Sequence, residues 1–339
     1  MTSVAVSAEE NKKKEKKVKV KQPKTPMSKE KFHKIMFGTK DDMGLLKKIV
    51  VYVILTCVGF VFVYPLLKVL SMSFMSLADL LDSSINWIPS KLSFENYKMT
   101  MKAMDYWKAL KDSVIISGLP TLCQVISCSI VGYGLARYDF KGKKLIFGLI
   151  IFAFVLPSSL TLTTQYQFYN SLGWVGTMKT FIIPAILANG FKSQLFILIC
   201  WSFFKQIPPV LNEAASIDGA GHFKSFFRIA LPSASGALIV VLIFSFVWYW
   251  NEQYLSQLYL YSKSDNVGTY TPLINQLSIF QDVFASEYSN ADGLTSSATI
   301  NDAFRMAATI LTILPLLIIY AVLQKQFVES VDRAGITGE

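Results

Sequence analysis

Six long apolar runs constrain the fold of this chain more than any other feature. A transmembrane helix needs about 20 mostly apolar residues to cross the hydrocarbon layer of a bilayer. The 339-residue sequence contains six runs of that length, at roughly residues 49–70, 113–136, 145–166, 181–204, 234–258 and 303–325. Charged residues make up only 17% of the chain, whereas soluble domains carry about 25%. The sequence therefore predicts an all-α, polytopic membrane protein with six transmembrane helices.

The second run differs from the others because small and hydroxyl residues interrupt its apolar side chains. Such residues let helices approach closely inside a membrane, and they favour contact with other helices over contact with lipid. These residues are Ser113, Ser117, Gly118, Thr121, Ser127, Ser129, Gly132 and Gly134.

Lysine and arginine residues indicate the orientation of the chain, because cytoplasmic loops of membrane proteins carry an excess of them. If the N-terminus is cytoplasmic, the inner segments 1–48, 137–144, 205–233 and 325–339 hold 23 of the 33 basic residues. We therefore predict a multi-pass protein of the plasma or inner membrane with both termini in the cytoplasm.

The first 48 residues hold 14 lysines against 6 acids, which accounts for most of the net charge of +10. A terminal charge run with few aromatic residues predicts a disordered, solvated tail. It does not predict nucleic-acid binding, because no aromatic platform accompanies the lysines. It is not a signal peptide either, since the apolar run that follows lacks a small-residue cleavage site. Binding of the lysines to anionic lipid and simple solvation are both compatible with this composition.

Two segments on the predicted outer side are long enough to fold. In residues 71–112, Pro89 breaks the chain, and the part that follows predicts an amphipathic helix lying along the surface. The loop at residues 259–302 is rich in Ser, Asn, Asp and Thr. A loop of that length is uncommon unless it is functional or disordered.

The sequence lacks a motif for nucleotide binding and the residues for a catalytic triad. It contains no phosphate-binding loop of the type G-x-x-x-x-G-K-[ST], and its only histidines, His33 and His222, build neither a catalytic site nor a metal site. The four cysteines (Cys57, Cys123, Cys128 and Cys200) lie in apolar runs without ligand spacing, which predicts free buried thiols. We expect no enzymatic activity, cofactor or metal, so the energy for any transport must come from an ion gradient or from a partner.

One charged residue, Lys192, lies deep within a predicted span, and Asn189 and Gln194 are its polar neighbours in the sequence. A charge inside a membrane indicates a functional site by default. The alternative is that the fourth helix is short or broken, so that Lys192 extends toward a water-filled cavity. Ion coupling normally leaves acidic residues inside the spans, and this sequence has none at depth.

The stretch NEAASIDGAG at residues 212–221 follows the fourth run. Pro208 and Pro209 interrupt the helix that leaves the membrane, and Asn212 is expected to cap a new helix. Glu213 would then lie in the first turn, where its charge complements the helix dipole. The two alanines that follow leave a smooth surface that another backbone can approach.

The stretch continues as HFKSFFRIALP at residues 222–232. Gly219 and Gly221 are expected to reverse the chain with positive φ angles, and Pro232 is expected to end the second helix. The apolar residues of that helix recur at helical spacing at Phe223, Phe226, Phe227 and Ala230. A helix–turn–helix that rests on lipid explains the aromatic and basic residues. A knob that fits a cleft of another protein also explains why the outermost part is small, acidic and turned by glycine.

Glu213-Ala214-Ala215 and Gly219, followed by Ile229-Ala230-Leu231-Pro232, resemble the EAA signature of permease subunits in binding-protein-dependent ABC importers. The similarity extends over nearly all of residues 45–330. LARYDFKGKK (135–144) resembles the positively charged loop between the second and third spans of that family. FFKQIPP before the signature, WYWNEQYL (248–255) and FENYK (94–98) resemble its carbohydrate branch. The six-span count resembles the smaller permease of the maltose-type pair.

The resemblance implies a type I ABC importer permease fold with a cytoplasmic coupling helix at about residues 212–217. That helix would be inserted into a groove of an ABC ATPase dimer, which would supply all the energy. The residues implied in docking are Glu213, Ala214, Ala215, Asp218, Gly219 and Ala220. The other implied partners are a second permease subunit, an extracellular sugar-binding protein facing the outer loop, and membrane lipids.

The implied function is import of an oligosaccharide, and the alternatives are another solute, an ion-coupled transporter or a scaffold that transports nothing. The candidate substrate pathway comprises Asn189, Lys192, Gln194, Trp248 and Asn251. Trp248, Tyr249 and Trp250 are also compatible with interface anchors, and Asn251 with a solvated helix end. The predicted organisation is a tail (1–48), a permease domain (49–325) containing the EAA loop (205–233) and the outer loop (259–302), and a C-terminal tail (326–339).

Overall fold

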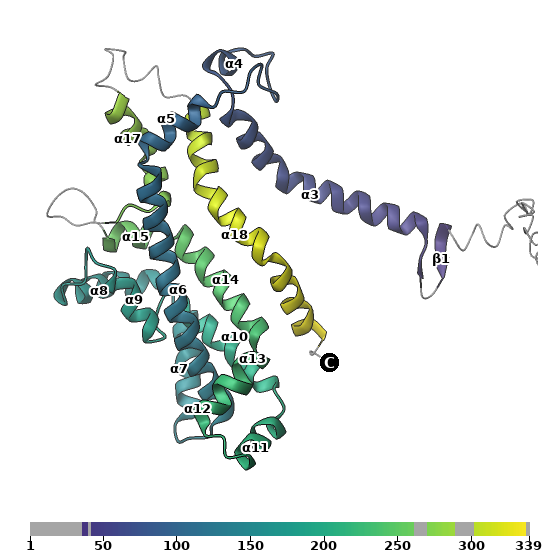
Figure 1. Cartoon of the computed structure of the whole chain (residues 1–339), viewed down its shortest axis with the longest axis vertical. Coiled ribbons are helices and arrows are strands. Elements are labelled where there is room, and N and C mark those ends of the chain that lie inside the picture. The colour runs from purple at the N-terminus through teal and green to yellow at the C-terminus, as the bar shows by residue number, and fades with distance from the viewer. Residues whose placement is uncertain (1–35, 40–41, 261–269, 289–301, 337–339) are drawn as a thin grey trace, which may run out of the picture. The chain divides into compact units, whose positions relative to one another are not determined.

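The computed structural model describes residues 36–39, 42–260, 270–288 and 302–336, which are almost entirely helical (Figure 1). Most of the predicted tail at 1–48 and much of the predicted outer loop at 259–302 lie outside the described residues. The chain divides into two compact units at Pro65, within helix α3 (Leu45–Ser73).

The first unit begins with a small antiparallel hairpin. Strand β1 (Gly38–Thr39) pairs with strand β2 (Asp42–Met43), with Gly38 opposite Met43. Gly44 then connects the hairpin to α3, and a Cβ atom at this position would lie 2.2 Å from the Gly38 nitrogen. Only glycine therefore fits this connection. Helix α3 contains the first predicted span and is long enough to cross a membrane.

Helix α6 (Tyr106–Arg137) is the centre of the second unit. It packs against α9 (Lys179–Ile186), α10 (Ser193–Gln206) and α14 (Ser235–Asn251). The predicted packing role of its small and hydroxyl residues is confirmed for most of them, because Ser113, Ser117, Thr121, Ser127, Ser129 and Gly132 are all buried. At Gly132 the backbones of α6 and α10 come so close that a Cβ atom on this residue would lie 2.6 Å from the Cβ atom of Cys200.

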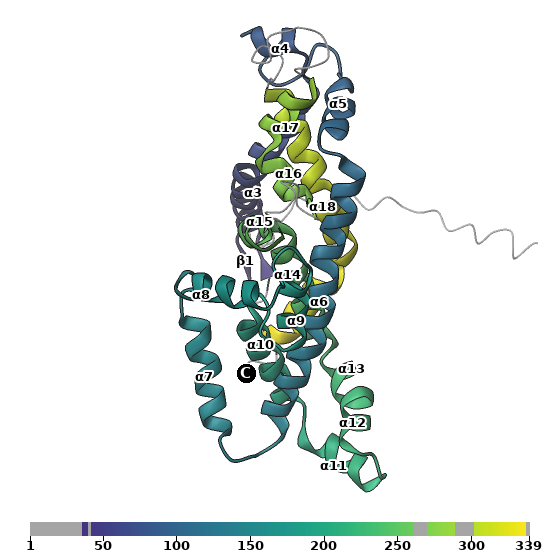
Figure 2. The ribbon, with the colours of Figure 1, turned by 90° about the vertical axis from the view of Figure 1, so that its left-hand side faces the viewer.

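Three of the six predicted spans are continuous helices by length and composition: α3, α6 and α18 (Asp302–Ile336). Each of the other three only overlaps a pair of helices that is bent at a short break. Helix α7 (Lys143–Val155) meets α8 (Ser158–Ser171) at 100°. Figure 2 shows the bend between them. The expectation of one helix over 145–166 is therefore wrong. Pro157 has no N–H to donate, and it forces the preceding residue, Leu156, into an extended conformation with ψ of 126°.

The described part of the second unit also contains short helices. They are α4 (Leu77–Leu81), α5 (Glu95–Ala103), α15 (Gln253–Leu260), α16 (Leu273–Ser278) and α17 (Phe280–Tyr288). Of these, α4, α5 and α17 lie at one end of the unit, and α15 lies nearer its middle (Figure 1, Figure 2). The helix expected after Pro89 is present as α5, but it packs against α17 and α18 and does not simply lie along the surface. Its buried side is polar: the Asn96 side chain donates to the backbone carbonyls of Ser73 and Met75, at 2.9 Å each.

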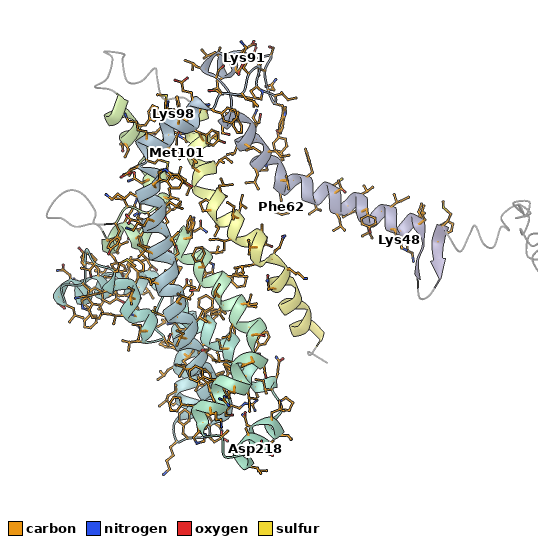
Figure 3. The ribbon with its side chains drawn as sticks, in the orientation of Figure 1. Lys48, Phe62, Lys91, Lys98, Met101 and Asp218 are labelled. Carbon is orange, nitrogen blue, oxygen red and sulfur yellow. The ribbon has the colours of Figure 1, made fainter. Side chains whose placement is uncertain are left out.

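The opposite end of the second unit carries α11 (Pro209–Ile217), α12 (His222–Ser225), the π-helical turn η1 (Phe226–Ala230) and α13 (Leu231–Ser233). Asp218 lies at the tip of this end, and Lys98 and Met101 lie at the other (Figure 3). The EAA stretch and helix α5 are thus separated by the length of α6 (Figure 3).

Candidate functional site

The segment that carries the EAA signature leaves the helical body at two adjacent prolines. Helix α10 ends at Gln206, Pro208 precedes α11, and Pro209 is its first residue. Proline suits that position because the first N–H groups of a helix have no intrahelical partner. We refer to residues 208–221 as the α11 segment.

The expectation that Asn212 caps this helix is wrong. Because the prolines themselves start the helix, Asn212 is already inside it, and Glu213 lies beyond the first turn. The Asn212 side-chain oxygen instead accepts a hydrogen bond from the Ser225 hydroxyl at 3.1 Å. This bond joins α11 to α12.

The end of α11 depends on Gly219. Its φ of +74° is the left-handed conformation that residues with a Cβ disfavour. The reversal lets the Ala220 N–H donate to the Ala215 carbonyl at 2.8 Å and the Gly219 N–H donate to the Ser216 carbonyl at 3.1 Å, which satisfies carbonyls at the helix end. The positive φ expected at Gly219 is confirmed. The same expectation is wrong for Gly221, whose φ is −65°.

The six residues implied in docking do not share one environment. Glu213, Ala214, Asp218 and Gly219 are exposed, Ala220 is half-buried and Ala215 is buried. The exposed side of α11 also carries apolar residues, since Val210 is 67% and Ile217 87% exposed. A short helix with a carboxylate between exposed aliphatic side chains is suited to contact with a protein surface.

The aromatic half of the stretch is split between the interior and the surface. Phe226 and Ala230 are buried, whereas Phe223 and Phe227 are exposed. The expectation that Pro232 ends the helix is wrong, because Pro232 falls in the first turn of α13. Before it lies a π-helical turn, in which the Leu231 N–H donates to the Phe226 carbonyl. The break comes at Ala234, where the chain bends by 77° into α14.

The fourth span is interrupted between α9 and α10. Two residues with side chains at this break have positive φ, Ala188 at 55° and Lys192 at 60°. Such conformations cost of order 1–3 kcal/mol each and persist only where surrounding contacts hold them. The break confirms the interpretation of a broken helix around Lys192, whose side chain is exposed.

A buried polar group, which we call the Gln124 cluster (Thr121, Gln124, Ser193 and Ser245), holds this break. The Gln124 amide donates to the Phe191 carbonyl at 2.7 Å and to the Ser193 hydroxyl at 3.0 Å. The Ser245 hydroxyl lies 3.2 Å from both the Gln124 carbonyl oxygen and the Thr121 hydroxyl. All four side chains are at most 2% exposed. Three separate helices (α6, α10 and α14) therefore meet in one satisfied network.

Tyr249 supports the same break from α14. Its hydroxyl accepts the Phe191 N–H at 3.1 Å, and a Cβ atom on Gly190 would lie 2.7 Å from that hydroxyl. Tyr249 and Trp250 are each 3% exposed, and the Trp250 indole donates to the Thr312 carbonyl at 3.3 Å. Their interpretation as interface anchors is therefore wrong, because both belong to the packed interior.

Four of the five pathway candidates lie at or beside the break. The Gln194 amide donates to the Asn189 side chain at 3.4 Å, and the Lys192 ammonium lies 5.7 Å from the centre of the Phe191 ring. Trp248 is half-buried, with its ring 5.3 Å from that of Phe196. Asn251 is an exposed residue at the end of α14, and its side-chain amide donates to the Val247 carbonyl of its own helix at 2.9 Å.

Sequence reasoning missed Gln124, Ser193, Ser245 and Tyr249 as a group. The available signal was Gln124 itself, an amide in the middle of the apolar second run, because a polar side chain inside a membrane needs a partner. The partners could not be identified from the sequence, since they come from segments about 70 and 120 residues away.

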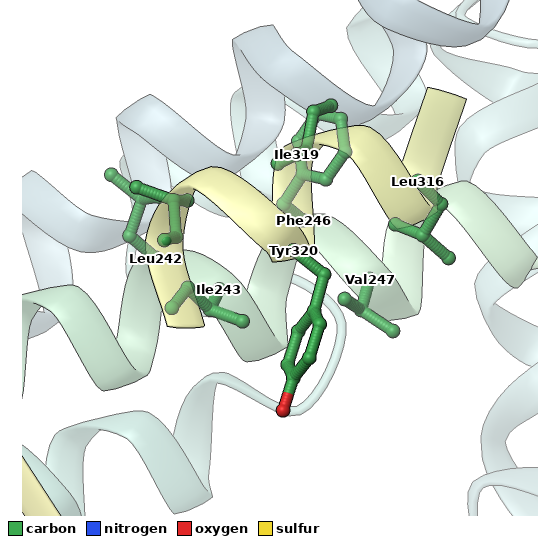
Figure 4. A pocket seen from close by; sticks show the side chains of 8 residues that line it. Leu242, Ile243, Phe246, Val247, Leu316, Ile319 and Tyr320 are labelled. Carbon is green, nitrogen blue, oxygen red and sulfur yellow. The ribbon is translucent and has the colours of Figure 1, made fainter. Parts of the chain in front are cut away.

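A depression between α14 and α18 does not have the chemistry of a sugar site. Its lining is Leu242, Ile243, Phe246, Val247, Leu316, Ile319, Tyr320 and Leu323 (Figure 4). Only the Tyr320 hydroxyl is polar. Within the described residues, no three His, Cys, Asp or Glu side chains gather as a metal site, and the four cysteines are free.

Residues 129–333 match the model of a family described as "Binding-protein-dependent transport system inner membrane component". The chain belongs to this family. It is a multi-pass inner-membrane permease subunit of a binding-protein-dependent ABC importer, whose partners are an ATPase and a substrate-binding protein, and ATP is hydrolysed in the separate ATPase subunit. The family resemblance is thus confirmed, and an ion-coupled transporter is not favoured.

Individual relatives match over most of their length. Protein LplC of Bacillus subtilis is 27% identical over 284 residues, covering 83% of this chain and 91% of LplC. The arabinooligosaccharides transport system permease protein AraQ of Halalkalibacterium halodurans is 29% identical over 288 residues, covering 83% of this chain and 93% of AraQ. The fold is shared with a crystal structure of a bacterial ABC transporter involved in the import of the acidic polysaccharide alginate. That match has a TM-score of 0.68 and 18% identity, and it covers 85% of this chain and 98% of the other.

Proposed function

We propose that this permease imports an oligosaccharide through a pathway that passes the break in the fourth span. The observation that carries the proposal is the chemistry of that break. Amides of Asn189 and Gln194 and the ring of Trp248 lie there beside a rigid, buried support. Amide groups bind sugar hydroxyls, and aromatic faces cover their apolar sides. AraQ, named for arabinooligosaccharides, supports a saccharide as the solute.

The α11 segment is the proposed coupling element. Glu213, Ala214, Asp218, Gly219 and Ala220 would contact the groove of an ATPase subunit, while Ala215 would support them from the buried side. Closure of an ATPase dimer would draw this segment toward that of a second permease and rock the spans between inward- and outward-facing states.

The proposed arrangement places both termini and the α11 segment in the cytoplasm, as the distribution of lysine and arginine favours. The α5 end would then face the extracellular sugar-binding protein. A second permease would complete the pathway, with lipid around both. The proposed division of the chain is a tail (1–48), a permease domain (49–325) and a C-terminal tail (326–339).

An acidic oligosaccharide is a second candidate, and Lys192 favours it. Its ammonium is exposed at the break, and among the described residues no carboxylate lies within ion-pair distance. Import of digalacturonate that is lost in Lys192→Gln, while uptake of neutral arabinotriose is retained, would identify this class. Equal loss of both would assign Lys192 a role in the shape of the break.

The proposed coupling is tested by purifying the tagged protein in mild detergent and identifying co-purifying proteins by mass spectrometry. We expect an ABC ATPase and a second permease with the wild-type chain. Glu213→Ala and Gly219→Val should lose the ATPase and keep the second permease. Recovery of the ATPase in equal amounts from both variants would refute the coupling role of the α11 segment.

Transport is tested in proteoliposomes that contain the recovered complex and its binding protein. Tritiated arabinotriose, maltotriose and digalacturonate serve as probes. ATP-dependent uptake of at least one supports saccharide import. A complex that hydrolyses ATP but takes up none of the three, together with a binding protein that binds none, would refute it.

A further inference from the structure

Two adjacent residues at the end of α6, Arg137 and Tyr138, contact the chain on either side of the α11 segment. Arg137 donates a guanidinium hydrogen bond to the carbonyl of Ile207, immediately before the segment. The Tyr138 ring meets the His222 ring edge-on, immediately after it, at 5.3 Å between centroids and 87° between planes. The 14 residues between Ile207 and His222 therefore form a loop with both ends at the same turn of α6.

The contact of Arg137 follows from the two prolines. A carbonyl near a helix end needs a donor from the following residues, but Pro208 and Pro209 have no N–H. The Leu211 N–H, four residues after Ile207, donates to the Pro208 carbonyl at 3.3 Å. Ile207 is 8% exposed, so its carbonyl requires an internal partner. The Arg137 side chain supplies it.

Arg137 keeps one donor unused. Its Nε atom is buried and has no hydrogen-bond partner among the described residues. Such a group is uncommon in a packed interior and calls for an explanation. A guanidinium that changes partners between two conformations would leave a donor unpaired in one of them.

Further contacts make the α11 segment and its surroundings move together. The Ser225–Asn212 hydrogen bond joins α12 to α11, and the Phe226 ring packs on Tyr133 of α6 at 5.0 Å. At Gly132, the residue before Tyr133, the α6 backbone lies against α10. The end of α6 is therefore the place where displacement of the segment reaches the helical body.

Helix α6 leads from this point to the Gln124 cluster. Gln124 precedes Arg137 by 13 residues, which corresponds to about 20 Å along a helix. It is bonded to Phe191, within the break, and to Ser193, the first residue of α10. A tilt of α6 imposed at Arg137 would therefore move the groups that hold the interrupted span.

We propose that Arg137 and Tyr138 form a clasp that holds both ends of the α11 segment and transmits its movement to α6. The clasp is a positioning device: neither residue touches ATP or solute. The proposal rests on the coupling role of the α11 segment given under Proposed function. It predicts that loosening the clasp separates ATP hydrolysis from transport while the complex stays assembled.

The test uses the full complex in proteoliposomes, with uptake of tritiated arabinotriose, maltotriose and digalacturonate and ATP hydrolysis measured in the same sample. Arg137→Leu and Tyr138→Leu should lower solute taken up per ATP by at least about fivefold, the lower end of typical coupling between sites. Arg137→Lys keeps a cationic donor and Tyr138→Phe keeps the ring. Both variants should therefore retain most of the solute taken up per ATP. Lys141→Leu is the matched control, because it removes an exposed charge from the connection between α6 and α7, which begins with Tyr138.

The outcomes separate the clasp from a structural role and from the coupling proposal. An unchanged ratio in assembled Arg137→Leu and Tyr138→Leu complexes overturns the clasp, as does a joint fall of uptake, hydrolysis and melting temperature. If the Arg137→Leu complex does not assemble, solute taken up per ATP is compared between Tyr138→Leu and Tyr138→Phe, and equal values overturn the clasp. A wild-type complex that binds no ATPase would refute the coupling role of the segment, whereas normal wild-type transport with unaffected variants refutes the clasp alone.

Discussion

The Gln124 cluster and the α11 segment show two ways of placing polar groups in one membrane protein. In the cluster, neutral amide and hydroxyl groups from three helices are buried and bonded to one another. The α11 segment instead exposes its carboxylates and several aliphatic side chains, and its side chains make few bonds to the body. The cluster is completed by contacts within the chain, whereas the segment is the surface that we propose an ATPase subunit completes. Changes in the cluster should therefore lower stability, and changes in the segment should lower assembly.

Gln124→Leu should have the largest effect. It removes the partner of the Phe191 carbonyl and of the Ser193 and Ser245 hydroxyls, and an unsatisfied buried polar group costs about 1–3 kcal/mol. We expect the melting temperature in detergent to fall by about 5 °C or more and uptake to be lost. Gln165→Leu is the control, because Gln165 bonds only Tyr169 within its own helix. Equal shifts in the two variants would contradict the importance of the cluster.

Gly132→Ala should be the next most damaging. The added Cβ would lie 2.6 Å from Cys200 Cβ and 2.9 Å from the Trp201 nitrogen, and overpacking of this kind costs about 1–3 kcal/mol. Gly134→Ala has open space at its Cβ and should gain up to about 1 kcal/mol from helix propensity. Melting temperatures of the two variants should therefore move in opposite directions. If the melting temperatures of both variants rose or both fell, the close contact between α6 and α10 at Gly132 would be contradicted.

Gly219→Val tests the segment in the same paired way. Its φ of +74° disfavours any residue with a Cβ by about 1–2 kcal/mol, and a β-branched residue more. Gly221 has a φ of −65° and open space, so Gly221→Val should be tolerated. Because most of the α11 segment is exposed, we expect it to rearrange locally around the substituted residue without unfolding the helical body. Gly219→Val should therefore lose the ATPase in co-purification with a smaller change in melting temperature than Gln124→Leu. A fall in melting temperature as large as that of Gln124→Leu would remove the distinction between the two regions.

Asp79→Asn should have the smallest effect, and that effect should depend on pH. The pKa of Asp79 is lowered chiefly by the Ser90 hydroxyl, which donates to its carboxylate, with further bonds from Ser76. A lowered pKa in the folded state stabilises the protein above the unfolded value, and that contribution is lost as the pH falls through the folded value. The melting difference between wild type and Asp79→Asn should therefore shrink between pH 7 and about pH 3.

The Gln124→Leu variant serves as the comparison across the same pH range. Amide and hydroxyl groups do not titrate there, so its melting difference should stay constant. A difference for Asp79→Asn that persists at low pH would mean that the carboxylate does not contribute through its charge.

Much of the fold could be predicted from local sequence. Six apolar runs indicated six spans, and the small residues of the second run indicated the most buried helix. Gly219 and the residues around it identified the turn and the family. These features are local, because apolar length, helix propensity and the φ preference of glycine act within a few residues.

The errors came where a local signal had two outcomes. Pro208 and Pro209 were expected to stop a helix and leave Asn212 as a cap, but proline also starts helices. Tyr249 and Trp250 were compatible with the membrane interface, but both found partners in the interior. Only the packing of other helices decides between such outcomes.

The sequence by itself determined how many times this chain can cross a membrane, which side its charges favour, and which stretch carries the EAA signature. The tertiary structure alone decided where the spans break, that Gln124 bonds Phe191 and Ser193 at the break in the fourth span, and that Arg137 and Tyr138 lie at the two ends of the α11 segment. The physical reason is the range of the interactions. Burial of apolar length is encoded residue by residue, whereas a hydrogen bond between segments 70 residues apart exists only once the helices have packed.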